Sequence, residues 1–144
     1  KKELNEALKY NLPLVCANPD KVVIRQNGKL ITCAGILADY YHNNGGEVFR
    51  YGKPFQAMYE KSFTILRSFN TTLALDKVLV IGDSLETDIL GANKNKLNSL
   101  LITNGIHKHE LTNSNNYEVY KNSIDKLCKK YSAFPNYIIK DFIF

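Results

Sequence analysis

Hydrophobic positions along the chain alternate between helical spacing and short apolar runs, which is typical of an α/β fold. Helical spacing predicts five helices, over residues 3–10, 35–44, 54–68, 87–96 and 117–131. Short β-prone runs predict five strands, over residues 14–17, 48–51, 77–81, 99–103 and 137–144. Because helices and strands alternate, we expect βαβ units around a parallel sheet.

Three local signals refine this pattern. Residues 21–25 and 29–33 flank Gln26-Asn27-Gly28, and an Asn-Gly pair between β-rich runs predicts a hairpin. Pro54 is expected in the first turn of its helix, where a missing N–H is tolerated. The run Val78–Ile81 predicts a strand that is buried on both faces of a parallel sheet.

Size and composition are those of one globular domain. The chain has 144 residues, of which 44% are hydrophobic and 23% charged. No apolar stretch approaches the roughly 18 residues of a spanning helix, so we expect no membrane partner. The three cysteines, Cys16, Cys33 and Cys128, are widely and irregularly spaced, which favours reduced thiols and a cytoplasmic location.

A net charge of +5 raises the question of nucleic-acid binding. The lysines stand singly or in pairs, such as Lys1-Lys2 and Lys129-Lys130, and are interspersed with carboxylates. No basic run of the kind that follows a phosphate backbone is present. We therefore expect a solvated surface and no nucleic-acid partner.

Clustered carboxylates follow the most hydrophobic predicted strand. Asp83 stands directly after it, and Asp88 returns in the first turn of the next predicted helix. Ligands of open α/β sheets bind at the carboxyl ends of the strands, and oxygen ligands without sulfur or imidazole suit Mg²⁺. An equally weighted alternative is that Asp83 caps the helix while Glu86 and Asp88 complement its dipole.

Two further polar features of the sequence could take part in chemistry. Lys53 lies between a short predicted strand and a helix, where an ammonium group could neutralise a phosphoryl group. Taken alone, it fits a solvated surface lysine better. His107 and His109 form an H-x-H pair, but no third ligand is near in sequence, which disfavours metal binding there.

Five short motifs follow one another in a recognisable order. They are Ala17-Asn18-Pro19-Asp20, Cys33-Ala34-Gly35, Tyr51-Gly52-Lys53-Pro54, the run Val80–Ala92 containing Gly82-Asp83 and Asp88, and Leu101–Ile106. Together they resemble the later part of the haloacid-dehalogenase-like hydrolases. The likeness is to the group with a large α/β cap, which includes sugar-phosphate and nitrophenyl-phosphate phosphatases. It covers residues 3–106, whereas residues 107–144 match only in their helix-then-strand layout.

This resemblance implies an α/β fold with a Rossmann-like three-layer α/β/α core that is incomplete and preceded by the end of the cap. Residues 1–33 would be the cap remnant and residues 34–144 the later part of the core. The implied catalytic residues are Lys53, Asp83 and Asp88. Asp83 and Asp88 would form the metal site for the cofactor Mg²⁺, and Lys53 would hold the phosphoryl group.

The resemblance also places Asn18 and Asp20 near the junction of cap and core, with Asn18 as a candidate substrate- or phosphate-binding residue. At the end of the helix predicted over 87–96 the family often has Ala-Gly, whereas this chain has Asn95-Lys96. Because asparagine tolerates the left-handed conformation, this difference bears on the helix cap more than on function.

One family motif does not occur in the sequence. The family's nucleophile lies in an Asp-x-Asp after an N-terminal strand, and the 144 residues contain no Asp-x-Asp. We therefore expect the C-terminal portion of a Mg²⁺-dependent phosphatase that acts on a small phosphorylated metabolite, inactive by itself. Its partner would be the missing N-terminal part, or another chain that covers the open sheet edge. The alternative is a non-catalytic remnant of the fold that serves as a binding or interaction module.

Overall fold

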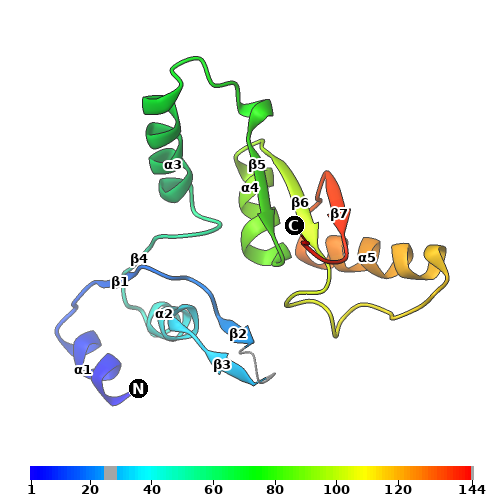
Figure 1. The fold of residues 1–144 in the computed structure, drawn as a ribbon. Coiled ribbons are helices and arrows are strands. Elements are labelled where there is room, and N and C mark those ends of the chain that lie inside the picture. Colours follow the sequence, from blue (N-terminus) through cyan, green and yellow to red (C-terminus); the bar gives the residue numbers. More distant parts are fainter. Residues whose placement is uncertain (25–28, 144) are drawn as a thin grey trace. The chain divides into compact units, whose positions relative to one another are not determined.

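The structure is a computed structural model that describes residues 1–24 and 29–143. The chain forms two compact units, residues 1–58 and residues 59–144, and each is described by itself (Figure 1). The division expected from the family resemblance, between residues 33 and 34, stays a prediction. The predicted turn Gln26-Asn27-Gly28 lies outside the described residues.

The first unit contains two pairs of strands and two helices. Strands β1 (Leu14–Cys16) and β4 (Val48–Arg50) pair in parallel. Strands β2 (Val22–Ile24) and β3 (Leu30–Thr32) pair antiparallel, which confirms the two strands of the predicted hairpin. The helices are α1 (Lys2–Lys9) and α2 (Ala34–Asn43), both close to their predicted bounds.

Helix α2 packs against the parallel pair of strands in the first unit. Ala38 and Tyr41 of this helix are buried, and the Tyr41 hydroxyl donates a hydrogen bond to the Leu12 carbonyl at 2.5 Å. Asp39, also on α2, accepts a hydrogen bond from Arg50 at 2.9 Å at the end of β4. The helix therefore contacts the chain just before β1 and the last residue of β4.

The second unit is a three-stranded parallel sheet with helices. The strands are β5 (Leu79–Gly82), β6 (Asn98–Ile102) and β7 (Tyr137–Ile139), in the spatial order β5-β6-β7. Between or before them come α3 (Gln56–Phe69), η1 (Leu75–Lys77), η2 (Leu85–Ile89), α4 (Leu90–Lys94) and α5 (Tyr117–Tyr131). The parallel pairing confirms the predicted βαβ layout.

The core of this unit joins α5, η2 and the central strand. Its fully and nearly fully buried members are Leu85, Ile89, Leu101, Ile124, Leu127, Cys128 and Ala133. Burial raises the pKa of the Cys128 thiol, and the negative charge of Asp125 raises it further. Cys128 is therefore an inert core residue, consistent with a reduced thiol.

Strand β5 differs from its prediction. Leu79 is 45% exposed and Ile81 is 42% exposed, so the strand is not buried on both faces. Leu79 and Ile81 share one face of the strand, and β6 is the strand's one neighbour among the described residues, so this face and one edge of β5 are both open. An apolar strand with an open edge and an uncovered face is typical of a sheet that pairs with another segment.

Several helix boundaries also differ. Pro54 precedes α3, which begins at Gln56 and not at the predicted residue 54. Along this helix Tyr59 is buried, whereas Leu66 is 38% exposed. The helix predicted over 87–96 begins earlier, with the π-helical turn η2. At its end Lys96, not Asn95, takes the positive φ.

The last strand is shorter than predicted. It ends at Ile139, whereas the apolar pattern predicted a strand over residues 137–144. Within the described residues, no helix combines the length and the apolar composition that crossing a membrane requires.

Candidate functional site

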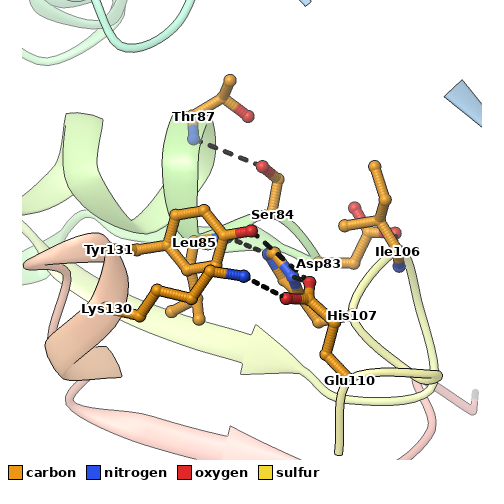
Figure 2. Close-up of polar contacts among 9 residues, drawn as sticks. All are labelled: Asp83, Ser84, Leu85, Thr87, Ile106, His107, Glu110, Lys130 and Tyr131. Atoms are coloured by element: carbon orange, nitrogen blue, oxygen red, sulfur yellow. Dashed lines mark hydrogen bonds and ion pairs between the residues drawn. The ribbon is translucent and has the colours of Figure 1, made fainter. Parts of the chain in front are cut away.

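Asp83 lies at the carboxyl end of β5, where the sheet edge faces the loop that follows β6. The backbone N–H of Ile106, in that loop, donates to Asp83 Oδ2 at 3.0 Å. A Cβ at Gly105 would lie only 2.3 Å from the same oxygen, so the close approach requires glycine. Figure 2 shows Asp83 beside Ile106 and His107 of this loop. A hydrogen bond from the loop after β6 thus holds the Asp83 carboxylate in place.

Asp88 is buried, with 4% exposure, one turn into the following helix. The backbone N–H of Ser84 donates to its Oδ2 at 3.2 Å. A Cβ on Gly82 would lie 2.2 Å from the Asp88 carboxyl carbon, so Gly82 leaves the space that this carboxylate occupies. Both aspartates therefore contact the short segment that connects β5 to η2.

The capping alternative is wrong for Asp83. Ser84 is the N-cap of η2, because its hydroxyl accepts a hydrogen bond from the Thr87 N–H at 3.3 Å. Glu86 and Asp88 do lie in the first turn, as the dipole part of that alternative expected. Asp83 is left outside the helix, with its side chain directed to the loop after β6.

Tyr59 of α3 lies close to Asp88, a contact that was not predicted from the sequence. Burial and then the negative charge of Asp88 raise the pKa of Tyr59 to about 12. Its hydroxyl is buried and, among the described residues, has no hydrogen-bond partner. A Cβ at Gly91 would lie 2.1 Å from that hydroxyl, so the ring packs directly on α4. The one signal in the sequence for this contact is that residue 59 is a tyrosine, with a hydroxyl group that a phenylalanine would lack.

Asp83 and Asp88 fit Mg²⁺ in their chemistry. Mg²⁺ is held by one or two carboxylates together with water and substrate phosphate. The Ile106 N–H occupies Asp83 Oδ2, and in the described part of the chain Asp83 Oδ1 has no hydrogen-bond partner. No group of three or more His, Cys, Asp or Glu residues is placed to hold a metal within residues 1–24 and 29–143. The chain therefore offers a partial oxygen site.

Lys53 and Asn18 lie in the first unit, on neighbouring loops. They follow the carboxyl ends of β4 and β1, which pair in parallel. Gly52, at φ +96°, lies against the preceding loop, because a Cβ there would be 2.8 Å from Pro19 Cδ. Asn18 accepts a hydrogen bond from the Asp20 N–H at 3.1 Å, and both Lys53 and Asn18 are exposed.

The predicted site residues thus form two groups. The structure brings Asp83 and Asp88 together in the second unit, and it brings the loops of Lys53 and Asn18 together in the first. That these two groups meet in one active site stays a prediction of the family resemblance.

His107 is a residue whose role the sequence did not indicate. It is buried, and its Nε2 accepts a hydrogen bond from the Leu85 N–H at 3.0 Å. Its H-x-H neighbour, His109, is exposed. The contact joins residues 22 positions apart, which no local spacing reveals.

Comparison with known proteins identifies the family. A family model described as HAD-hydrolase-like matches residues 50–133. A haloacid dehalogenase-like hydrolase from Brucella suis has 36% identity and a TM-score of 0.69 over 77% of this chain and 41% of its own. The chain therefore belongs to the haloacid-dehalogenase-like hydrolases.

Two other similar solved structures are described as a possible phosphatase and a phosphatase. A possible sugar phosphatase from Cytophaga hutchinsonii has 25% identity and a TM-score of 0.73, over 97% of this chain and 45% of its own. A glycerol phosphate phosphatase from Mycobacterium tuberculosis, solved with magnesium, has 27% identity and a TM-score of 0.62, over 98% of this chain and 37% of its own. The chain spans less than half the length of these proteins. A search of curated proteins found no match.

Proposed function

We propose that the chain supplies the metal-binding and phosphate-neutralising part of a Mg²⁺-dependent phosphatase for small phosphomonoesters. The observation that carries this proposal is the pair Asp83 and Asp88 at the carboxyl end of β5, with one Asp83 oxygen held by the Ile106 N–H. Membership of the hydrolase family supports it, as do the sugar and glycerol phosphate phosphatases among the similar structures.

The chemistry needs an aspartate that lies outside this sequence. Its carboxylate attacks phosphorus, an aspartyl-phosphate bond forms, and the ester P–O bond breaks as the leaving alcohol takes a proton. Water then attacks the phosphorus, the P–O bond to the aspartyl oxygen breaks, and phosphate and the free carboxylate are released. Bound Mg²⁺ supplies charge that offsets the repulsion between the attacking carboxylate and the phosphate.

The roles proposed for this chain's residues rest on the local contacts of Asp83 and Asp88 and, for Lys53 and Asn18, on the family resemblance. Asp83 presents Oδ1 to the cation, while Asp88 holds the Ser84 N–H and so keeps the turn after β5 in place. Lys53 neutralises the transferring phosphoryl group, and Asn18, on the neighbouring loop, binds the substrate or its phosphate.

The proposed partner is a segment that pairs with β5. Exposed Leu79 and Ile81 lie on this strand, four and two residues before Asp83. A strand added to that edge would end beside Asp83, which is where the attacking carboxylate is needed. The segment can belong to a longer form of this protein or to another chain.

The test is p-nitrophenyl phosphate hydrolysis by this chain together with a segment that carries Asp-x-Asp. We expect Mg²⁺-dependent turnover that Asp83→Asn lowers at least about 100-fold, because a cation ligand is lost. The matched control is Asp76→Asn, an exposed aspartate at the opposite end of β5, which should keep wild-type turnover. Full turnover by the Asp83 variant would contradict the site, and no turnover in any assembly would favour the non-catalytic binding module.

A further inference from the structure

His107 is a buried histidine in the loop after β6, and the proposed chemistry gives it no role. Its side chain is 7% exposed, and the Leu85 N–H donates to its Nε2 at 3.0 Å. A backbone N–H can only donate, so Nε2 is the unprotonated acceptor and Nδ1 carries the proton. The hydrogen-bond network thus assigns the neutral tautomer with the proton on Nδ1.

Glu110 holds the other side of the imidazole. The Nδ1–H of His107 points to Glu110 Oε1 at 2.7 Å, and Lys130 Nζ donates to Glu110 Oε2 at 2.5 Å. The Tyr131 ring packs beside His107 with 5.0 Å between ring centroids. Figure 2 shows these side chains converging from the loop and from the end of α5. The last turn of α5 therefore fixes the orientation of His107.

The Glu110 carboxylate remains charged in this arrangement. Partial burial raises its pKa, but hydrogen bonds from Lys130 and His107 outweigh that effect, and the net pKa of Glu110 is lowered. The hydrogen bond with Glu110 in turn raises the pKa of Lys130. A charged carboxylate is a strong acceptor for the Nδ1–H, which strengthens the tautomer assignment.

Two adjacent loop residues contact the Asp83 segment. Ile106 donates its N–H to Asp83 Oδ2, and His107 accepts the N–H of Leu85, two residues after Asp83. The Asp83 side chain and the Leu85 backbone are thereby tied to the same loop at two points. Without the imidazole, the turn after β5 would lose its Leu85 anchor, and the bond from Ile106 to the carboxylate would remain as its other tie to this loop.

His107 does not act as a metal ligand in this arrangement. Both ring nitrogens are used, Nε2 by Leu85 and Nδ1 by Glu110. His109 is exposed, and the described residues place no third metal-binding side chain with the pair. The hydrogen bonds of His107 therefore give the H-x-H pair a structural explanation.

We propose that His107 is a positioning residue for Asp83. Held by Glu110, it anchors the Leu85 N–H and so keeps the Asp83 carboxylate oriented with Oδ1 available to a divalent cation. This inference rests on the proposed function for the identity of that ligand. Hydrogen-bond partners of this kind orient metal-binding side chains in many proteins.

The experiment uses the whole chain and Mn²⁺ as the probe. Amide hydrogen exchange at Leu85 and Ile106 reports the two loop anchors, and paramagnetic broadening of nearby amide signals gives the Mn²⁺ affinity. We expect His107→Ala to speed exchange at both amides and to weaken Mn²⁺ binding about tenfold. The exposed His109→Ala is the matched control and should behave as the wild type.

Two conservative variants keep the test decisive if His107→Ala does not fold. A glutamine at 107 carries a carbonyl oxygen that can accept the Leu85 N–H, so His107→Gln should restore most protection at Leu85 and most Mn²⁺ affinity. Glu110→Gln retains an acceptor for Nδ1–H but loses the charge pair with Lys130, so its effect should be smaller and in the same direction as that of His107→Ala.

The positioning role and the proposed function fail in different ways. If Asp83→Asn weakens Mn²⁺ binding while the His107 and Glu110 variants do not, His107 is only structural and this proposal is overturned. If Asp83→Asn leaves Mn²⁺ affinity unchanged, the metal role of Asp83 fails. In that case amide exchange at Ile106 in the His107 variants tests the positioning role. An exchange rate equal to that of the wild type overturns it.

Discussion

At the scale of single residues, two glycines determine where the two carboxylates can lie. Gly105 leaves room for Asp83, and Gly82 leaves room for Asp88. Neither glycine has a positive φ, so the requirement is space and not backbone conformation. Each of the two is a glycine because a neighbouring carboxylate occupies the space that a Cβ would take.

Gly105→Ala should displace Asp83. The added methyl group would lie 2.3 Å from Asp83 Oδ2, so the carboxylate or the loop has to move. We expect a loss of about 1–3 kcal/mol in unfolding free energy, measured by urea denaturation, because overpacking of this kind has that cost. We also expect faster amide exchange at Ile106. Unchanged Ile106 exchange would mean that the contact with Asp83 is not maintained in solution.

Tyr59 gives a prediction for alkaline pH. The pKa of Tyr59 is raised from 10.0 to about 12 by burial and by the charge of Asp88. Between these two values the folded state holds a proton that the unfolded state has lost, so stability should fall as pH rises from 10 towards 12. Tyr59→Phe should remove this part of the pH dependence in unfolding measurements.

The control for this prediction is Tyr117→Phe, since Tyr117 is 71% exposed. Asp88→Asn should lower the ionisation pH of Tyr59 in an ultraviolet titration, because the neighbouring negative charge is gone. A wild-type titration curve in that variant would show that Asp88 does not act on Tyr59.

At the scale of elements, local pattern predicts most of the helices and strands. The helix over Tyr117–Tyr131 has its predicted bounds, and the parallel pairing of β5, β6 and β7 follows from the βαβ order. These features depend on periodicity and on residues close in sequence. Local pattern predicts the first and last residues of an element less well, as the earlier start of η2 and the shorter β7 show.

The candidate site was predicted only in part, for a physical reason. Asp83 and Asp88 follow an apolar strand, which marks them from sequence alone. The bonds from Ile106 to Asp83 and from Leu85 to His107 join loops more than 20 residues apart, and no local pattern encodes them. The exposure of β5 depends on what lies next to it in space, so its apolar run predicted burial that this chain does not provide.

Helix α5 matters for the site because its last turn holds Glu110 through Lys130. Its N-cap is Asn116, whose side-chain oxygen accepts from the Glu118 N–H at 2.9 Å and the Val119 N–H at 3.3 Å. Asn116→Ala should lower the unfolding free energy by about 1 kcal/mol in urea denaturation, whereas Asn116→Asp should keep it. Equal stability of the Ala variant and the wild type would contradict this cap.

At the scale of the whole molecule, β5 leaves an open apolar edge in the described part of the chain. Leu79 and Ile81 are each more than 40% exposed on it. The isolated chain should therefore self-associate with rising concentration, and Ile81→Lys should reduce the association in analytical ultracentrifugation. A wild-type chain that stays monomeric throughout would contradict the open edge as a pairing surface.

The central claim is that this chain works together with an Asp-x-Asp segment outside its sequence. The most direct test is a denaturing intact-mass measurement on material purified under native conditions from its source. We expect the 144-residue sequence, with its mass of 16.4 kDa, to be found either within a longer polypeptide or beside a second one, and the additional part to carry Asp-x-Asp. A species of 16.4 kDa alone would contradict the claim that the chain is part of a phosphatase that uses this mechanism.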